Sequence, residues 1–315
     1  MYAWAVLGYT LGVILWGAFV RAAGAGNGCG EHWPLFDGQF LPAHPQIKML
    51  IEFLHRVSSG LDAILIAVLV AGAFWLFPKR HAVRRGAVAA GVFIISEALL
   101  GAALVLFGWV GGNVSPARFA ADASHLANTL LLLASLALTA VWAGATPAPE
   151  RGPGWKLSLA LFGVIVTGAA GAIAAVGDTL FPAVSLAAGL RADFSGATRL
   201  MERVRVLHPV IALAVGAYIL YIAFESLNGR AHRLALGLGG AVLLQWACGG
   251  LDLLLLAPAW MQLLHLLTAD LLWLVLVVYC ANVLACQDEN AEKAALPPPA
   301  SARSAGTGRA AGGLS

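Results

Sequence analysis

Long apolar segments with few charged positions occupy most of the chain. Each is about 20 residues or longer, which is the length a helix needs to cross the hydrocarbon core of a membrane. The eight segments are 3–22, 49–77, 86–109, 120–144, 157–177, 204–224, 234–256 and 261–286. Strands of an outer-membrane barrel would alternate apolar and polar residues, whereas these segments are continuously apolar. The pattern predicts an all-α polytopic membrane protein with eight transmembrane helices.

Composition supports this prediction. Of the 315 residues, 60% are hydrophobic and 11% are charged, which leaves too little polar surface to cover a soluble globule. The lipid bilayer is therefore an expected partner. Because the net charge of +3 is small and spread along the chain, we expect no nucleic-acid partner.

The two ends of the chain indicate its location. The N-terminal stretch MYAWAVLGYT has no basic region before its apolar part, so we expect a retained helix rather than a signal peptide. No Arg- and Ser-rich transit segment precedes it, and a bacterial plasma membrane is the simplest location. Residues 287–315 are rich in Ala, Pro, Gly and Ser without apolar periodicity, which predicts a disordered tail.

Lysine and arginine in the loops set the expected orientation. The loops after the second, fourth and sixth segments carry Lys79, Arg80, Arg84, Arg85, Arg151, Lys156, Arg230 and Arg233. We expect these loops, and with them both termini, on the cytoplasmic side. The bias is modest, because four arginines also precede or open the sixth segment, namely Arg191, Arg199, Arg203 and Arg205.

Four of the eight histidines carry the main chemical signal. They are His55, His125, His208 and His265, and each lies about four to seven residues into an even-numbered segment. Even-numbered helices run in the same direction and rise about 1.5 Å per residue, so the four imidazoles are expected within about 10 Å of one face. Polar groups are costly inside a bilayer and tend to mark function. The other four histidines fall in loops, where a solvated side chain explains them.

The chain also matches itself at intervals of 140 to 153 residues, which indicates an internal repeat. The matched pairs are 16–28 with 167–179, 51–57 with 204–210, 96–104 with 244–252, and 123–133 with 263–273. They place Gly17 on Gly168 and His55 on His208. We therefore predict two four-helix bundles in parallel topology, residues 1–145 and 157–286, with two of the four histidines in each.

Paired imidazoles across a four-helix bundle suit a heme, whose iron takes one nitrogen ligand on each side. Zinc is the competing metal. It is disfavoured because the histidines divide two by two and no nearby Cys or acidic group completes a tetrahedron. Cys248, Cys280 and Cys286 lie in or near the last two helices, where packing as small apolar side chains explains them.

These features resemble a known family. The stretch GAFVRAAGAGNGCGEHWPLFDGQFLP, the Glu-x-x-His-Arg of the second helix and the doubled four-histidine plan resemble the heme A synthase family, which converts heme O to heme A for cytochrome oxidases. The resemblance implies a heme b cofactor on His208 and His265. It also implies that the half with His55 and His125 takes heme O, and that Glu52 is needed to oxidise a ring methyl to a formyl group.

Glu52 has two interpretations. It lies three residues before His55 and shares one helix face with it, which would set a carboxylate beside the substrate ring and suit it to exchange a proton as the methyl is oxidised. The alternative is that Glu52 only pairs with Arg56 or Arg21 near the membrane surface.

Three arginines are candidate contacts for heme propionates, because guanidinium binds carboxylate bidentately. Arg205 stands where the first half has Glu52, one turn before a predicted ligand. Arg21 and Arg56 could hold the substrate propionates, although snorkelling to the interface explains them equally well. Pro209 replaces Arg56 in the second half, where the family often has arginine, and this is a departure from the resemblance.

Buried acids can orient a histidine by accepting its second ring N–H. The candidates are Asp62, Glu97, Asp122, Asp252 and Asp270. We favour Asp122, which lies three residues before His125, with a cap or dipole partner of its helix as the alternative.

Two functions of other classes stay open: a di-heme b-type electron-transfer protein, and a heme-binding assembly protein, neither of which oxidises a methyl. The histidines fit all three functions, but Glu52 beside His55, without a counterpart in the second half, favours the enzyme. A heme O synthase (farnesyltransferase) is a candidate partner and a homo-oligomer stays open.

Cys29 has no second cysteine before the second segment, so the loop disulfide that many bacterial relatives have cannot form.

Overall fold

The computed structural model describes residues 1–30, 32–33, 46–144, 147–149, 152–194 and 200–295. Within these ranges it contains helices and no strand. The helices are α1 (Tyr2–Ala22), α2 (Ile47–Leu76), α3 (Ala82–Leu106), α4 (Pro116–Trp142), α5 (Trp155–Leu180), α6 (Leu186–Phe194), α7 (Leu200–Glu225), α8 (His232–Leu254) and α9 (Ala259–Ala295). All except α6 are long and apolar enough to cross a membrane. The prediction of an all-α protein with eight transmembrane helices is confirmed.

Two helices differ from the sequence prediction. The short helix α6 was not predicted, because a nine-residue helix is too short to give a long apolar run. The last helix was expected to end at 286, but α9 continues to Ala295. Its added residues are mostly Glu, Ala, Lys and Gln, which favour a helix on intrinsic propensity. The predicted disordered tail therefore begins in helix, and 296–315 lies outside the described residues.

Local sequence explains several helix ends. Ser115 precedes α4, and its Oγ accepts a hydrogen bond of 3.3 Å from the backbone N–H of Arg118, while Pro116 occupies the first helical position. Both are favourable at a helix N-terminus. At α3, the ring Nδ1 of His81 accepts from the N–H of Val83 at 3.3 Å. This loop histidine therefore has a capping role.

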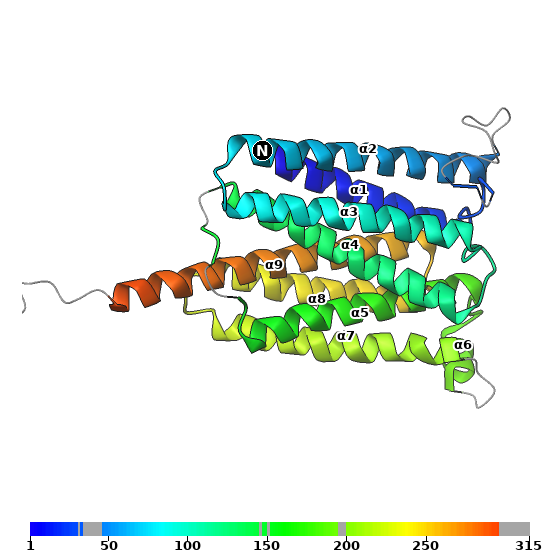
Figure 1. The fold of residues 1–315 in the computed structure, drawn as a ribbon. Coiled ribbons are helices and arrows are strands. Elements are labelled where there is room, and N and C mark those ends of the chain that lie inside the picture. The colour runs from blue at the N-terminus through cyan, green and yellow to red at the C-terminus, as the bar shows by residue number, and fades with distance from the viewer. Residues whose placement is uncertain (31, 34–45, 145–146, 150–151, 195–199, 296–315) are drawn as a thin grey trace, which may run out of the picture.

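The helices pack in two groups that follow the chain order (Figure 1). In the first group α1 packs on α2 and α4, and α3 packs on α2 and α4. In the second, α5 packs on α7 and α9, and α8 packs on α7 and α9. The groups meet where α4 packs on α5 and α9, and where α1 packs on α9. This packing is what two bundles would give, and the residue-by-residue repeat between them stays a prediction.

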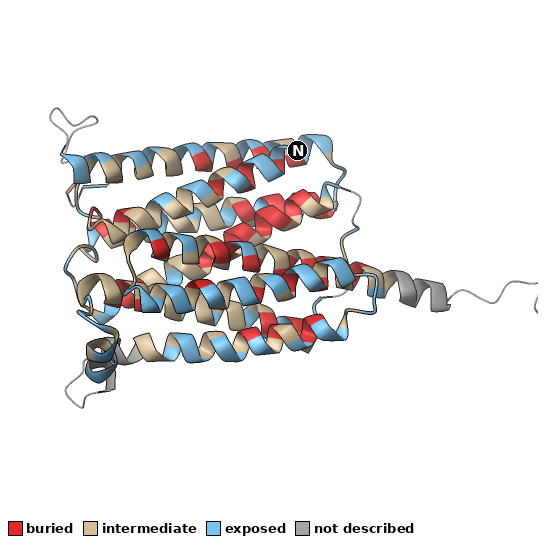
Figure 2. Cartoon of the chain, turned by 180° about the vertical axis from the view of Figure 1, so that it is seen from behind, coloured by how far each residue is buried: buried red, intermediate tan, exposed pale blue. Residues whose placement is uncertain are grey.

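The N-terminus and the end of α9 lie at the same end of the bundle (Figure 1), and α2, α4, α7 and α9 all begin at the opposite end. The main core cluster is concentrated on the side of the termini. It includes Val6 of α1, Leu136 of α4, Leu238 of α8 and Leu276 of α9. Figure 2 shows the buried positions gathering toward the same side. The other end of the bundle is less closely packed.

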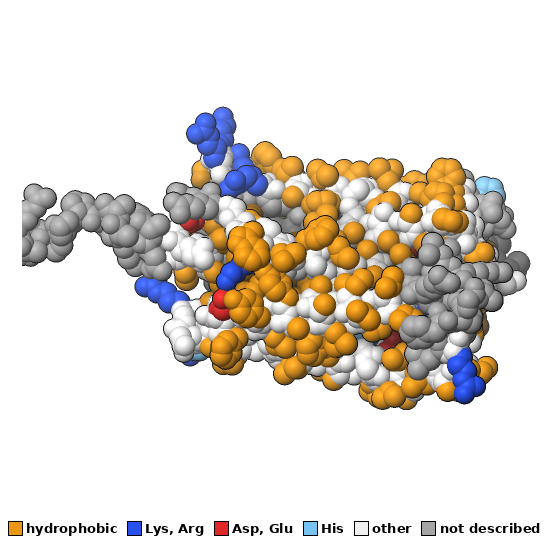
Figure 3. Space-filling view, turned by 90° about the horizontal axis from the view of Figure 1, so that it is seen from below, with side chains coloured by type: hydrophobic (Ala, Val, Ile, Leu, Met, Phe, Trp, Pro, Cys, Tyr) orange, Lys and Arg blue, Asp and Glu red, His pale blue; other side chains and the backbone are white. Residues whose placement is uncertain are grey.

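Hydrophobic side chains spread over the face of the bundle that Figure 3 shows. Large apolar side chains are also exposed on α2 and α3, among them Ile64, Val68 and Val92. A soluble monomer rarely exposes so much contiguous apolar surface, and lipid covers such a surface in a polytopic protein. The central spans are α4, in which 61% of the most apolar part is buried, and α9 with 44%, against 17% in α3 and α5.

Candidate functional site

The four helical histidines lie near the end of the bundle opposite the termini. They follow the first residue of α2, α4, α7 and α9 by six to nine positions, and those helices begin at the same end (Figure 1). At 1.5 Å per residue, a difference of three positions is about 5 Å along the axis. The imidazoles therefore share one level of the bundle, two in each group of helices.

Each imidazole faces a glycine of a neighbouring helix. The pairs, with the distance that a β-carbon added to the glycine would have from Cε1 of the ring, are Gly17 with His55 (2.8 Å), Gly171 with His208 (2.9 Å), Gly249 with His265 (2.9 Å) and Gly101 with His125 (3.8 Å). In three of the four pairs the ring occupies space that any other residue would fill. Glycine on one helix therefore positions the histidine on the next.

These glycines correct one part of the internal alignment. Gly17 was aligned with Gly168, but the glycine that faces His208 is Gly171, three residues later. A β-carbon at Gly168 would instead lie 3.1 Å from Leu130 of α4, so Gly168 serves the contact between the two groups. The stretch is almost entirely Gly and Ala, which is why the sequence alone aligned it in the wrong register. The alignment of Gly101 with Gly249 agrees with the structure, because each faces a histidine.

His208 and His265 lie close enough to share one metal ion. Their ring centroids are 6.4 Å apart and their planes are nearly perpendicular, at 84°. Two imidazoles that each bind a metal through one nitrogen at about 2 Å have centroids separated by roughly 6 Å. The pair therefore fits two axial ligands of a single iron.

Each ring of this pair has a polar partner, through Nδ1 for His208 and at the edge that carries both ring nitrogens for His265. The Nδ1 of His208 lies 3.1 Å from the backbone carbonyl oxygen of Thr167, an acceptor that fixes the ring hydrogen on Nδ1 and directs Nε2 to a metal. The amide nitrogen of Gln245 lies 3.2 Å from Nδ1 of His265 and 3.4 Å from its Nε2. Gln245 is itself held by the hydroxyl of Thr268, which donates to its amide oxygen.

His55 lies on α2 and His125 on α4, both in the first group of helices. The Nδ1 of each is buried and makes no hydrogen bond within the part of the chain that the structure describes. Buried polar atoms are nearly always satisfied, so one nitrogen of each ring still needs a partner. The nearest acid to His125 is Glu97, whose Oε1 lies 3.5 Å from Nδ1.

Glu52 is buried, with 3% of its surface exposed. Its Oε2 accepts a hydrogen bond from the backbone N–H of Cys29 at 2.9 Å, and its Oε1 forms an ion pair with Arg56 at 2.6 Å. Arg56 also donates to the carbonyl oxygen of His32 at 2.9 Å. Glu52 therefore ties the loop after α1 to α2. The pairing with Arg56 that the sequence offered as an alternative is present, and the carboxylate is directed to these partners rather than to the imidazole of His55.

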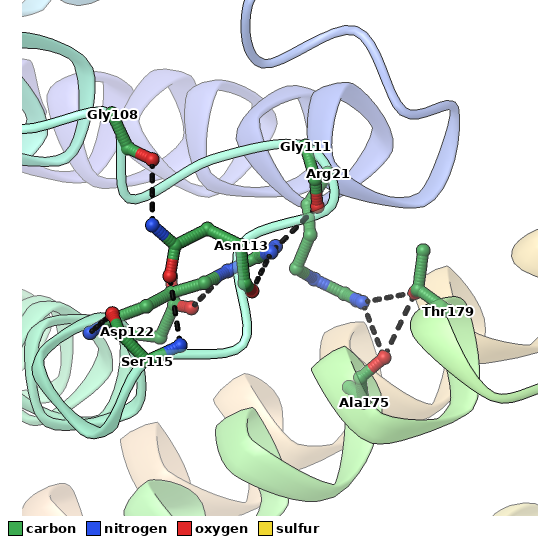
Figure 4. A network of polar contacts seen from close by, with 9 residues as sticks. Arg21, Gly108, Gly111, Asn113, Ser115, Asp122, Ala175 and Thr179 are labelled. Atoms are coloured by element: carbon green, nitrogen blue, oxygen red, sulfur yellow. Dashed lines mark hydrogen bonds and ion pairs between the residues drawn. The ribbon is translucent and has the colours of Figure 1, made fainter.

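Arg21 reaches across to the other group of helices (Figure 4). It donates to the carbonyl oxygen of Ala175 at 2.8 Å, to Thr179 Oγ1 at 3.0 Å and to Gln262 Oε1 at 3.0 Å. A single guanidinium from α1 therefore binds α5 and the beginning of α9. Its role includes joining the two groups, which sequence reasoning did not foresee.

Arg205 lies one turn before His208 in α7. It forms an ion pair of 3.0 Å with Asp178 of α5 and donates to the carbonyl oxygen of Phe181 at 3.1 Å. Its side chain is 12% exposed. A mostly buried cation thus lies at the level of the second histidine pair, where a carboxylate of a bound group could join it.

The acid next to a histidine is Glu97, and this corrects the preference for Asp122. The carboxylate of Asp122 lies 3.5 Å from Nε of Arg118, a buried arginine that also donates to the carbonyl oxygens of Gly111 and Asn113 at 2.6 and 2.7 Å (Figure 4). Asp122 thus helps to hold the loop before α4. Sequence spacing along one helix suggested Asp122, whereas Glu97 belongs to a different helix.

Zinc finds little support in this arrangement. Across the residues that the structure describes, no three His, Cys, Asp or Glu side chains gather as they would in a zinc site. His208 and His265 meet as a pair, which is the donor set of a bis-histidine heme.

Comparison with known proteins gives one family. The model of the family described as cytochrome oxidase assembly protein matches residues 1–277. A protoheme IX farnesyltransferase of Thermus thermophilus is 43% identical over 291 residues, which is 90% of this chain and 48% of that protein. A heme A synthase of Bacillus mycoides is 36% identical over 96 residues, 30% of this chain and 31% of that protein. The chain spans about half the length of the Thermus relative.

Proposed function

Because the chain belongs to the cytochrome oxidase assembly protein family, we propose that it is a heme A synthase, which oxidises one ring methyl of heme O to a formyl group. Its family and its heme A synthase relatives support a role in heme A assembly for cytochrome oxidase. The observation that carries the proposal is the set of four imidazoles at one level, two per group of helices, each seated against a glycine.

We assign a resident heme b to His208 and His265. Their centroid separation of 6.4 Å supports this assignment, as does the carbonyl of Thr167 that holds His208 by Nδ1. When bound, heme b supplies one-electron transfer. Arg205 provides a mostly buried cation at the same level, which suits a heme propionate.

We assign the heme O substrate to His55 and His125. The place of these two histidines in the first group of helices, at the level of the second pair and with a glycine of a neighbouring helix facing each ring, supports a second heme site. Glu52 is the proposed catalytic group, because it is a buried carboxylate on the helix of His55, three residues away. Its role would be to exchange a proton with the substrate methyl carbon as it is oxidised, while Arg56 and the N–H of Cys29 hold the carboxylate in place.

Arg56 and Arg21 differ as candidates for the substrate propionates. Arg56 lies one turn beyond Glu52 with its guanidinium toward the first loop, which suits a contact with substrate at that end. Arg21 already makes three hydrogen bonds with the second group of helices. We therefore propose Arg56 as the main contact, and for Arg21 a position between the two heme sites.

We further propose a bacterial plasma membrane location with both termini in the cytoplasm. The N-terminus and the end of α9 share one end of the bundle (Figure 1), and that end carries Lys79 and Arg80 between α2 and α3 and Arg84 and Arg85 in the first turn of α3. Positive residues are retained on the cytoplasmic side. The histidine level then lies toward the outer leaflet.

A heme O synthase is the proposed source of substrate. The Thermus relative carries the name protoheme IX farnesyltransferase and is about twice as long as the matched region. A protein that includes a region like this chain and bears that name supports a close relation between heme O formation and this chain. Direct transfer in the membrane would spare an apolar heme from crossing water.

The alternative is a membrane protein with two b-type hemes that transfers electrons or carries heme without methyl oxidation. The four histidines support it equally. Pigment analysis separates the two functions. The chain is purified after expression with and without a heme O source, and its extracted hemes are separated by chromatography. A heme A synthase yields formyl heme only with heme O present, whereas two unmodified hemes under both conditions would reject the proposal.

Histidine variants test the assignment of the sites. We expect His208→Ala to lose the resident heme b and His55→Ala to keep heme b but yield no formyl heme. His232→Ala is the matched control, because His232 is an exposed histidine at the other end of the bundle. Loss of heme b from His55→Ala rather than from His208→Ala would reverse the assignment.

A further inference from the structure

The two groups of helices differ in charge beside one histidine of each. Glu97 of α3 and Gln245 of α8 occupy matching places in the aligned segments 96–104 and 244–252. Each lies next to the histidine of the following helix, His125 or His265. The side chains are nearly equal in shape, but one ends in a carboxylate and the other in a neutral amide.

Glu97 is held in place by the helix that carries His125. Its Oε1 accepts a hydrogen bond from Thr129 Oγ1 at 2.5 Å, and its Oε2 accepts one from the amide of Asn128 at 2.5 Å. Ser96 Oγ in turn donates to Asn128 Oδ1 at 2.6 Å. The carboxylate is thus aimed at α4 rather than at solvent, and its side chain is 18% exposed.

The carboxylate lies where the second ring nitrogen of His125 needs an acceptor. Glu97 Oε1 is 3.5 Å from Nδ1, slightly longer than a hydrogen bond, and Nδ1 makes no other hydrogen bond in the described residues. If Nε2 binds iron, Nδ1 carries a hydrogen that points to this carboxylate. A small rotation of the ring then closes the contact, because hydrogen bonds at such sites often shorten when the ligand binds.

We propose that Glu97 is a positioning residue that makes His125 a stronger electron donor to iron than His265, and so gives the heme of the first group a lower reduction potential than heme b. A carboxylate that accepts the Nδ1 hydrogen gives the imidazole anionic character, which stabilises ferric over ferrous iron. The neutral amide of Gln245 has no such effect on His265.

The inference rests on the proposed function in one respect, which is that heme O binds between His55 and His125. It also predicts the direction of electron transfer between the two hemes. If both hemes were bound, a lower potential at the first site would favour electron transfer from the heme held by His55 and His125 to the heme b held by His208 and His265. The charge difference between the groups thus separates oxidation from electron acceptance.

Reciprocal exchange of the two side chains tests the proposal. Glu97→Gln keeps the shape of the side chain and one oxygen acceptor, but Thr129 and Asn128 both donate to the carboxylate, so one of the two hydrogen bonds is lost; the variant reproduces the side chain of the second group, and its unfolding temperature is measured beside its potentials. Gln245→Glu is the matched variant there. The readout is the reduction potential of each heme, measured by spectroelectrochemistry of the purified protein loaded with heme O. His125→Ala identifies which signal belongs to the first group.

We expect Glu97→Gln to raise the potential of the first heme enough to change its oxidised-to-reduced ratio at a fixed potential at least tenfold, which is about 59 mV for one electron. Gln245→Glu should instead lower the reduction potential of heme b. Unchanged potentials in both variants, with both hemes bound, would overturn the role of Glu97.

The outcome also separates this inference from the proposed function. Two bound hemes with the expected shifts but without formyl heme would reject the enzyme and leave the role of Glu97 standing. Formyl heme with unchanged potentials would support the enzyme and reject the role of Glu97. A chain that binds no heme through His125 would overturn both.

Discussion

At the scale of single residues, the position of each imidazole depends on the absence of a side chain on the neighbouring helix. A β-carbon at Gly171 or Gly249 would lie 2.9 Å from the ring of His208 or His265, a distance that forces the ring to move. The ring planes and their 6.4 Å separation depend on both glycines. Small residues in membrane helices usually allow backbones to approach, and here they make room for an imidazole ring.

We therefore expect Gly171→Ala and Gly249→Ala each to lose most of the bound heme b. Alanine favours a helix over glycine by up to about 1 kcal/mol, so a loss would come from the displaced ring and not from a weakened helix. Absorbance of heme per purified chain measures it. Gly101→Ala is the control, because its β-carbon would lie at an ordinary 3.8 Å from His125. Full heme b in the two test variants would contradict the seating of the rings.

Glu52 serves structure and, in our proposal, chemistry, and two substitutions separate these roles. Glu52→Gln keeps an oxygen for the N–H of Cys29, whereas Glu52→Ala removes the carboxylate that this N–H and Arg56 both contact. A hydrogen bond to a charged group contributes about 1.5–3 kcal/mol. We expect both variants to lose formyl heme, and only Glu52→Ala to lower the unfolding temperature. Formyl heme at the wild-type level in Glu52→Gln would confine Glu52 to holding the loop.

At the scale of helices, apolar length predicted the eight spans because a membrane helix must be continuous and apolar. It missed α6, which is too short to show such a run, and it ended α9 early because the polar residues beyond 286 still favour a helix. The four histidines could be identified from the sequence because one lies near the start of each even-numbered span. Glu97 and the register of Gly171 were not, because both depend on which side chain faces a neighbouring helix.

Arg21 is the clearest connection between the two groups of helices. Its three hydrogen bonds reach Ala175, Thr179 and Gln262. Hydrogen bonds that involve a charged group contribute about 1.5–3 kcal/mol each. We expect Arg21→Met to lower the unfolding temperature of the purified protein, and Thr179→Val, which removes one acceptor, to lower it less. Equal stability of Arg21→Met and wild type would show that the groups are held together by apolar packing of α4 and α9 alone.

At the scale of the whole molecule, the main apolar core and the four histidines occupy opposite ends of one bundle. The main core cluster, with Leu136, Leu238 and Leu276, lies on the side of the termini, and the histidines lie on the other. Where few apolar side chains are buried, local opening takes less free energy than unfolding of the core. A ligand that binds only the closed form then stabilises that end.

Hydrogen exchange of the chain in lipid nanodiscs tests this division. Backbone amides beside His265 should exchange faster than those of α4 near Leu136 when heme b is absent, and loading with heme b should slow the histidine end while changing the core little. Amides beside His265 and beside Leu136 are protected by helical hydrogen bonds of the same kind, so a difference between these two segments reports packing. Pro209 inside α7 removes one such bond beside His208, so that segment is compared only with and without heme b. His208→Ala, which should not bind heme b, serves as the control that removes the effect of loading. Equal protection at the two ends without heme would mean that the histidine end is as rigid as the core, and that the site is formed before its ligand arrives.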